Sequence, residues 1–134
     1  MDYDLVSVPQ RGCFFAFALL RNINMNPLDI AAAGSLWADI LAARGIRAYR
    51  LDRSYPQGIE GRNIGGDAGD TGLPDSFARG LSLQCSFECF EGEGDISFVK
   101  EAARILSPDS RLSIVPLYID VMHFVTVGAL SGRC

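Results

Sequence analysis

Three aspartates stand where they could bind a ligand that carries hydroxyl groups. Asp29 and Asp52 each lie at the end of a short apolar run, and Asp67 lies in a glycine-rich segment. Asp52 comes a little over twenty residues past the first of these runs, close to the ~20 expected of an acid that binds a ribose. A carboxylate suits a ribose because it accepts hydrogen bonds from both hydroxyls at once. The alternative is that strand ends carry polar residues only because they lie at the surface.

The segment around the first aspartate, residues 28–35, reads LDIAAAGS. A strand that leads through a small-residue loop into a helix is typical of nucleotide-like ligands, and a dinucleotide requires glycines in that loop. Ala31 and Ala33 place methyl groups where a pyrophosphate would pack, which disfavours NAD and FAD. A ligand with a ribose, an adenine and a small charged tail but no phosphate fits better. S-adenosylmethionine is such a ligand.

Alternating strands and helices are expected to position these residues. Residues 28–30 are predicted to form a strand, and Ser35 is the expected N-cap of a helix over residues 36–44 that ends before Gly45. A second strand is predicted over residues 46–51. Residues 53–76 are predicted to be mostly loop, with a short strand near Ile64, and so long a loop is usually functional.

Further elements are expected downstream. Residues 81–87 alternate as a strand, and Asp95 is the expected cap of a helix over residues 96–106. Ile96, Val99, Ala103 and Leu106 line one face of that helix, and Phe98, Ala102 and Ile105 widen it. Residues 107–110 end the helix, and residues 112–118 are predicted to form a strand buried on both faces. Residues 13–20 are expected to be a buried helix or strand, and residues 121–130 are ambiguous.

The order of elements predicts one α/β domain over residues 1–134. Strands that alternate with helices imply right-handed crossovers and a mostly parallel sheet. The expected architecture is a three-layer αβα sandwich with a Rossmann-like sheet and helices on both faces. In such sheets ligands bind beyond the carboxyl ends of the strands, where the strand order switches.

From about residue 27 to 118 the chain resembles the class I S-adenosylmethionine-dependent methyltransferases. LDIAAAGS resembles their first strand and loop, often written D-I-G-x-G, and AYRLD (48–52) resembles their second strand with its ribose acid. GGDAGDTGLPDSFA (65–78) resembles their segment G-D-A-x-x-L-P-x-x-S-F-D. Residues 83–117, with Arg104-Ile105-Leu106-x-Pro108 before an apolar strand, resemble their fourth strand, the next helix and the fifth strand.

This resemblance implies roles for the residues of the first two strand ends. Asp29 would orient the methionine end of S-adenosylmethionine, aided by backbone groups of Ala31, Ala33 and Gly34. Asp52 would bind the ribose hydroxyls. Glycines are usual in this loop, so the alanines partly obstruct close approach, and Gly34 is expected to supply backbone freedom one position early.

The resemblance assigns the rest of the ligand to later loops. Asp67 and Ala68 would recognise the adenine edge, and Ser86 and Phe87 would lie beside the methyl group. No catalytic residue is assigned, because methyl transfer to a nucleophilic acceptor needs mainly in-line alignment.

The chain departs from the family's pattern in its later part. Ala78 replaces an aspartate, and Asp109-Ser110 replaces a Gly-Gly turn. The usual C-terminal strand pair is expected to be lacking, and a homodimer through the incomplete sheet edge is therefore expected.

Composition limits the partners and the compartment. The net charge of −4 and the single lysine, Lys100, argue against nucleic acid and membrane surfaces. The four cysteines are predicted to be free thiols of a cytoplasmic protein. A zinc site that uses Cys85, Cys89 and His123 is the less favoured alternative, and no metal is expected. Glu88, Glu91 and Glu93 are predicted to be a solvated loop, Trp37 a core residue and His123 a structural one.

The sequence therefore predicts methyl transfer from S-adenosylmethionine to a small-molecule or glycan acceptor. The alternative is a degenerate, non-catalytic methyltransferase-like domain that serves as a dimerisation or scaffolding module. An open space bounded by Asp29, Asp52, Asp67 and Ser86 would favour the enzyme. Side chains of Ala31, Ala33 or Phe87 filling that space would favour the module.

Overall fold

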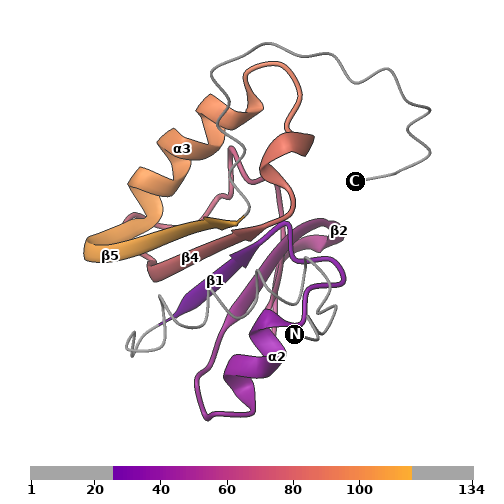
Figure 1. Ribbon diagram of the computed structural model, residues 1–134, viewed down its shortest axis with the longest axis vertical. Helices are drawn as coiled ribbons and strands as arrows, with labels where there is room; N and C mark the ends of the chain where they lie inside the picture. The colour runs from indigo at the N-terminus through magenta and orange to yellow at the C-terminus, as the bar shows by residue number, and fades with distance from the viewer. Residues whose placement is uncertain (1–25, 116–134) are drawn as a thin grey trace, which may run out of the picture.

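The computed structural model describes residues 26–115, which form one sheet with two α-helices (Figure 1). The elements are β1 (Pro27–Ile30), α2 (Trp37–Ala42), β2 (Tyr49–Glu60), β3 (Asn63–Gly65), β4 (Ala78–Gln84), η1 (Phe87–Cys89), α3 (Gly94–Ile105) and β5 (Leu106–Val115). The five strands pair in parallel in the order β3-β2-β1-β4-β5. The predicted α/β class with a parallel sheet is confirmed.

One face of the sheet forms the main core. Side chains alternate between the two faces of a strand, and the register places Leu51, Ile30 and Leu83 side by side. These side chains pack against Phe98 and Ile105 of α3 in one cluster of buried residues. The burial of this apolar face against α3 is the main stabilising interaction of the described chain, since apolar surface removed from water contributes ~25 cal/mol per Å².

The helix α2 lies on the opposite side of the sheet from α3 (Figure 1). Its buried residues Trp37, Ala38 and Leu41 form a separate small cluster with Ala48, the residue before β2. Asp39 on α2 pairs with Arg50 on β2, which ties the helix to the strand. The expectation that Trp37 is a core residue is confirmed, since its side chain is fully buried.

Strand β2 is much longer than predicted, and the interpretation of residues 53–60 as loop is wrong. The first part of β2 pairs with β3 through Arg50 and Leu51, and its last part doubles back so that Ile59 lies opposite Ile64. Gly58 and Gly61, at φ of 98° and 63°, permit these turns. The glycines that predicted a loop therefore shape a folded-back strand. The short strand expected near Ile64 is confirmed as β3.

Helix α2 is shorter than predicted at both ends, and its flanking residues behave partly as expected. Leu36 occupies the N-cap position, whereas Ser35 precedes it and accepts a hydrogen bond from the Trp37 N–H at 3.2 Å. Gly45 has the expected left-handed conformation, at φ 75°. The next residue, Ile46, donates its N–H to the Leu41 carbonyl at 3.0 Å and so satisfies the helix end.

The buried face of α3 differs from the primary face predicted for it. Phe98, Ala102 and Ile105 are buried, whereas Ile96 and Val99 are about half exposed. The apolar arc is wide enough for two orientations, and the observed one places the larger Phe98 in the core. The expected cap is also wrong, because Glu93 holds the N-cap position and Asp95 lies in the first turn.

The strands that flank α3 also differ from prediction. Strand β4 begins three residues before the predicted start and ends at Gln84, because Cys85 has a φ of 51°. Strand β5 begins directly after α3 and is one of the two edge strands of the described sheet. Leu112 is 37% exposed there, so the prediction of burial on both faces is wrong.

Several predictions concern residues outside 26–115, namely those on residues 13–20, 116–118, 121–130 and His123. Within 26–115, no helix is long and apolar enough to cross a membrane.

Candidate functional site

The candidate site lies at the edge of the sheet where the parallel strands end. From β1 the chain adds β2 and β3 on one side, and it then returns to place β4 on the other side of β1. The strand order therefore switches between β1 and β4, and ligands of open parallel sheets bind at such a switch. The loops after β1, β3 and β4 carry most of the predicted site residues.

Asp29 lies within β1, one residue before its end, and its side chain is fully buried. The Ser35 hydroxyl donates to Asp29 Oδ2 at 2.5 Å, while Oδ1 is buried without a hydrogen-bond partner. Burial raises the pKa of Asp29 to about 7, against the lowering effects of Ser35 and of the nearby Arg50. A buried carboxyl with one unpartnered oxygen is suited to a cationic or hydrogen-donating group.

The loop after β1 is shaped by two left-handed residues. Ala31 has a φ of 54° and Gly34 a φ of 79°. Glycine adopts this conformation freely, whereas alanine is strained in it. The roles expected from the sequence gave backbone freedom to Gly34 alone, but Ala31 adopts the left-handed conformation too. Ala33 is exposed, so its methyl group does not fill the interior of the protein.

Asp52 joins this loop to β2. Its Oδ2 accepts the Ala33 N–H at 3.1 Å and its Oδ1 accepts the Ser54 N–H at 2.8 Å. Burial raises the pKa of Asp52, but the hydrogen bonds from Ser54 and Ala33 outweigh it and the pKa lies below its ordinary value. Asp52 is therefore an ionised carboxylate at neutral pH. Each of its oxygens keeps a lone pair for a further donor.

Asp67 and Ala68 follow β3 and lie beside this edge. The Gly66 N–H donates to the Asp52 carbonyl at 3.3 Å, which joins their loop to β2. Asp67 Oδ1 accepts the Gly69 N–H at 2.7 Å, and Asp67 also pairs with Arg53. The Gly69 hydrogen bond and the Arg53 pair hold the pKa of Asp67 below its ordinary value, in spite of partial burial. Ala68 packs into the main core.

Ser86 and Phe87 lie after β4 and are not joined by any described hydrogen bond to the other site residues. The Ser86 hydroxyl donates to the Gln84 carbonyl at 2.9 Å. Phe87 packs edge-on against Phe90 and Phe98, toward α3. Phe87 therefore belongs to the edge of the main core, next to α3.

A row of polar residues crosses the sheet on the face opposite α3, and sequence reasoning missed it. The register aligns one residue of each strand, in the order Asn63, Arg50, Asp29, Ser82 and Ser113. Asp29, Ser82 and Ser113 are buried. A signal was available in the sequence, since LDI (28–30), YRL (49–51), LSL (81–83) and LSI (112–114) each place one polar residue between two apolar ones.

Arg50 is the cation of this row and the second residue missed by sequence reasoning. It lies in register with Asp29 and pairs with Asp39 of α2. Its charge favours the ionised form of Asp29, although burial of Asp29 has the larger effect on that carboxyl. Arg50 therefore stabilises the negative charge of the Asp29 carboxylate within the polar row.

The described cysteines differ in state. Cys85 is a free thiol, whereas Cys89 is disulfide-bonded, so the prediction of free thiols is wrong for Cys89. Burial and the nearby Glu88 raise the pKa of the Cys85 thiol, which makes it a poor nucleophile at neutral pH. Residues 26–115 contain no group of three or more His, Cys, Asp or Glu side chains placed to hold a metal ion.

No model of a known protein family matches the chain, and no curated protein matches it.

Proposed function

We propose that this chain binds S-adenosylmethionine at the carboxyl edge of its sheet and transfers the methyl group to a small-molecule or glycan acceptor. On this proposal the fold is a three-layer, Rossmann-like domain of methyltransferase type. The sequence resemblance and the strand order β3-β2-β1-β4-β5 both support it.

The observation that carries the proposal is the convergence of two carboxyl groups on one loop. Asp29 receives the Ser35 hydroxyl from the end of that loop, and Asp52 receives the Ala33 N–H from its middle. Burial raises the pKa of Asp29 to about 7, so this carboxyl is partly protonated at neutral pH, whereas the lowered pKa of Asp52 keeps it ionised. Two acids at one strand edge with different charge states suit a ligand that has a cationic group at one end and a diol further along.

The residues present fit such a ligand. The unpartnered Asp29 Oδ1 can accept from an ammonium group, and the partly exposed Asp52 can accept from ribose hydroxyls. Asp67 can accept from an exocyclic amine, beside the backbone of Ala68. Ala33 is exposed, whereas Ala31 and Phe87 are half-buried and pack against the main core.

S-adenosylmethionine supplies an electrophilic methyl group, so the chain has to bind, orient and exclude water rather than move protons. The loop after β1 and Asp52 hold one side, and the loop after β3 holds the other. Alignment of methyl group and acceptor accounts for the rate acceleration that such a site can give.

The direct test is isothermal titration of the protein with S-adenosylhomocysteine, with NAD as the parallel control. We expect micromolar binding of S-adenosylhomocysteine alone. Asp52→Asn should weaken it by about tenfold, as expected for loss of a charged acceptor from two hydroxyls. Asp109→Asn, an exposed change in β5 before its main pairing with β4 begins at Arg111, is the matched control and should bind normally. A folded protein that binds neither ligand would overturn the proposal.

The second candidate is the non-catalytic module, and exposed apolar side chains favour it. Ile96 and Val99 on α3 and Leu112 on the edge strand β5 are all exposed. Exposed apolar groups and unpaired strand edges favour association. Sedimentation of the wild type and of Val99→Asp tests this candidate, which requires a dimer that the substitution dissociates. A monomer at every concentration rules the module out as a dimerisation device.

A further inference from the structure

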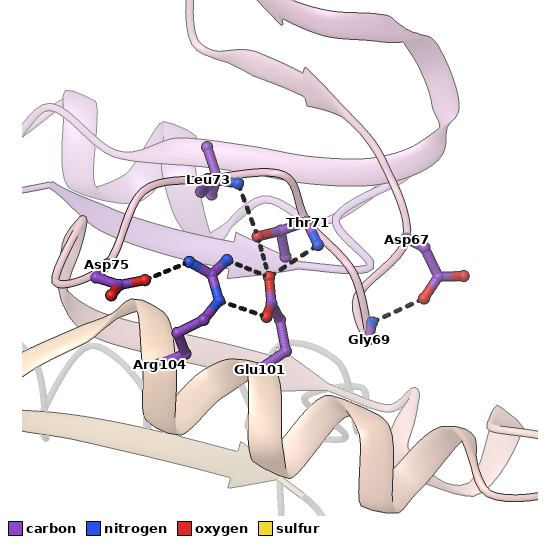
Figure 2. A network of polar contacts seen from close by, with 7 residues as sticks. All are labelled: Asp67, Gly69, Thr71, Leu73, Asp75, Glu101 and Arg104. Carbon is purple, nitrogen blue, oxygen red and sulfur yellow. Dashed lines mark hydrogen bonds and ion pairs between the residues drawn. The ribbon is translucent and has the colours of Figure 1, made fainter.

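The loop between β3 and β4 is fixed to α3 by a network of ionic hydrogen bonds (Figure 2). Glu101 of α3 is 8% exposed, and Figure 2 shows its carboxylate directed at the loop. Its Oε1 accepts the Thr71 N–H at 2.9 Å and the Thr71 hydroxyl at 2.6 Å. Thr71 in turn accepts the Leu73 N–H at 3.2 Å. The Glu101 carboxylate therefore orders Thr71 directly and Leu73 through the Thr71 hydroxyl.

Arg104 extends this contact along the loop. One turn further along α3 than Glu101, it donates to Glu101 Oε2 through Nε at 2.9 Å and to Oε1 through Nη2 at 2.7 Å. Its Nη1 donates to Asp75 Oδ1 at 2.6 Å, and its backbone carbonyl accepts the Ser76 N–H at 3.1 Å. We call Thr71, Asp75, Glu101 and Arg104 the loop clamp.

The start of the same loop, at Gly69, also packs closely against α3. A Cβ atom built on Gly69 would lie 2.9 Å from Ser97 Cβ, so only glycine permits this approach. The Gly69 N–H is the donor that holds Asp67, as Figure 2 shows. The position of Asp67 is thus set by the same helix face that carries the loop clamp.

Stability alone is a weak reason for this ion pair, because the Arg104 side chain is 36% exposed and such pairs contribute little. An ion pair with directed hydrogen bonds instead selects one conformation of the loop. The clamp satisfies Glu101 with four hydrogen bonds, which lower its pKa to about 2, chiefly through Arg104. A carboxylate that stays ionised at neutral pH and holds the loop in one conformation is expected where a binding site has to keep a fixed shape.

We infer that Glu101 and Arg104 are positioning residues that set selectivity for adenine, by holding the loop so that Asp67 and the Ala68 backbone face the base edge. This inference rests on the proposed function. Adenine offers an amino donor to a carboxylate and a ring-nitrogen acceptor to a backbone N–H. Hypoxanthine reverses both groups, so a fixed loop discriminates against it and a loose loop does not.

The test compares S-adenosylhomocysteine with S-inosylhomocysteine by isothermal titration. The wild type should prefer the adenosyl compound by at least about tenfold, the worth of one or two hydrogen bonds that become mismatched. Thr71→Val, which removes the hydroxyl at constant volume, should lose most of that preference. Thr71→Ser keeps the hydroxyl and should retain it.

A second variant protects the test against failure to fold. Asp75 is 79% exposed, so Asp75→Asn should fold normally and reduce the preference in the same direction by a smaller factor. If Thr71→Val lowers thermal stability but both ligands keep their wild-type affinity ratio, the clamp is merely structural and the inference is overturned. If the wild type binds neither compound, the proposed function fails and the inference falls with it.

Discussion

Replacing Ala31 by glycine is expected to stabilise the protein slightly, because Ala31 is held at a φ of 54°. A left-handed conformation costs an L-residue ~1–2 kcal/mol, and glycine costs ~0.5–1 kcal/mol more backbone entropy on folding than alanine. The methyl group of Ala31 also packs on the main core, which offsets part of the gain. The net expectation is an increase of about 0.5 kcal/mol in the free energy of unfolding.

Ala33→Gly is the matched control, two residues along the same loop. Ala33 is exposed and is absent from the left-handed residues, so glycine there gives only the entropic cost, a loss of about 0.5–1 kcal/mol. The two variants should therefore differ by about 1–1.5 kcal/mol in opposite directions from the wild type.

Urea unfolding followed by tryptophan fluorescence measures this difference. Trp37 is the single tryptophan, and it is fully buried at the start of α2, directly after the loop. Two-state unfolding with an unchanged slope against urea would license the comparison of midpoints. Equal destabilisation by both glycines would refute the reasoning, because it would mean that Ala31 is not strained.

Three further predictions concern stability. In the wild type, the free energy of unfolding should fall between about pH 4 and 7, because the pKa of Asp29 is about 7 in the folded protein and 3.8 ordinarily. The full fall is on the order of 4 kcal/mol. Asp29→Asn should flatten this pH dependence, and urea unfolding across that pH range measures it. Gly65→Ala should destabilise the protein by about 3 kcal/mol or more, since the added Cβ would lie 2.0 Å from the Pro56 carbonyl oxygen. Gly66→Ala is the control: the nearest atom to its added Cβ is 3.5 Å away, so it should have little effect on the melting temperature. Glu101→Gln should be less stable than the wild type at pH 7, and the gap should close as the pH falls from about 4.5 through about 2, where the wild-type carboxylate is protonated; acid titration followed by circular dichroism checks this.

The sequence predicted the parallel sheet and the approach of Asp29 and Asp52 to one loop because both depend on local patterns. The strand at LDI (28–30), the helix that follows it and the strand that contains Leu51 are spaced as a parallel sheet requires. Asp29 lies one residue before the end of β1, as expected, whereas the prediction that Asp52 follows its strand is wrong because β2 continues to Glu60; both carboxylates still hydrogen-bond to the loop after β1. Spacing along the chain is enough for this, because the connection between parallel neighbours is short.

What could not be predicted depends on contacts between distant segments. Glu101 and Thr71 are 30 residues apart, and nothing in either segment alone shows that the carboxylate binds the loop. The wide apolar arc of α3 fits two orientations, and only the packing of Phe98 against the sheet selects one. Residues 53–60, which include Pro56 and Gly58, are equally compatible with a loop and with a strand that doubles back.

The two sides of the candidate site therefore differ in how firmly they are held. The loop after β3 is tied to α3 by charged hydrogen bonds and joins the main core through Ala68. The loop after β1 is tied to the sheet by Asp52 and Asp29, contains a strained alanine, and leads to a helix whose buried residues form a separate small cluster. Regions with few buried contacts open at lower free energy than the core. Hydrogen exchange should thus be faster at the amides of α2 than at those of α3. A ligand bound at this edge should slow exchange more at α2 than at α3, because the loop after β1 and α2 are the less firmly held part that binding would order.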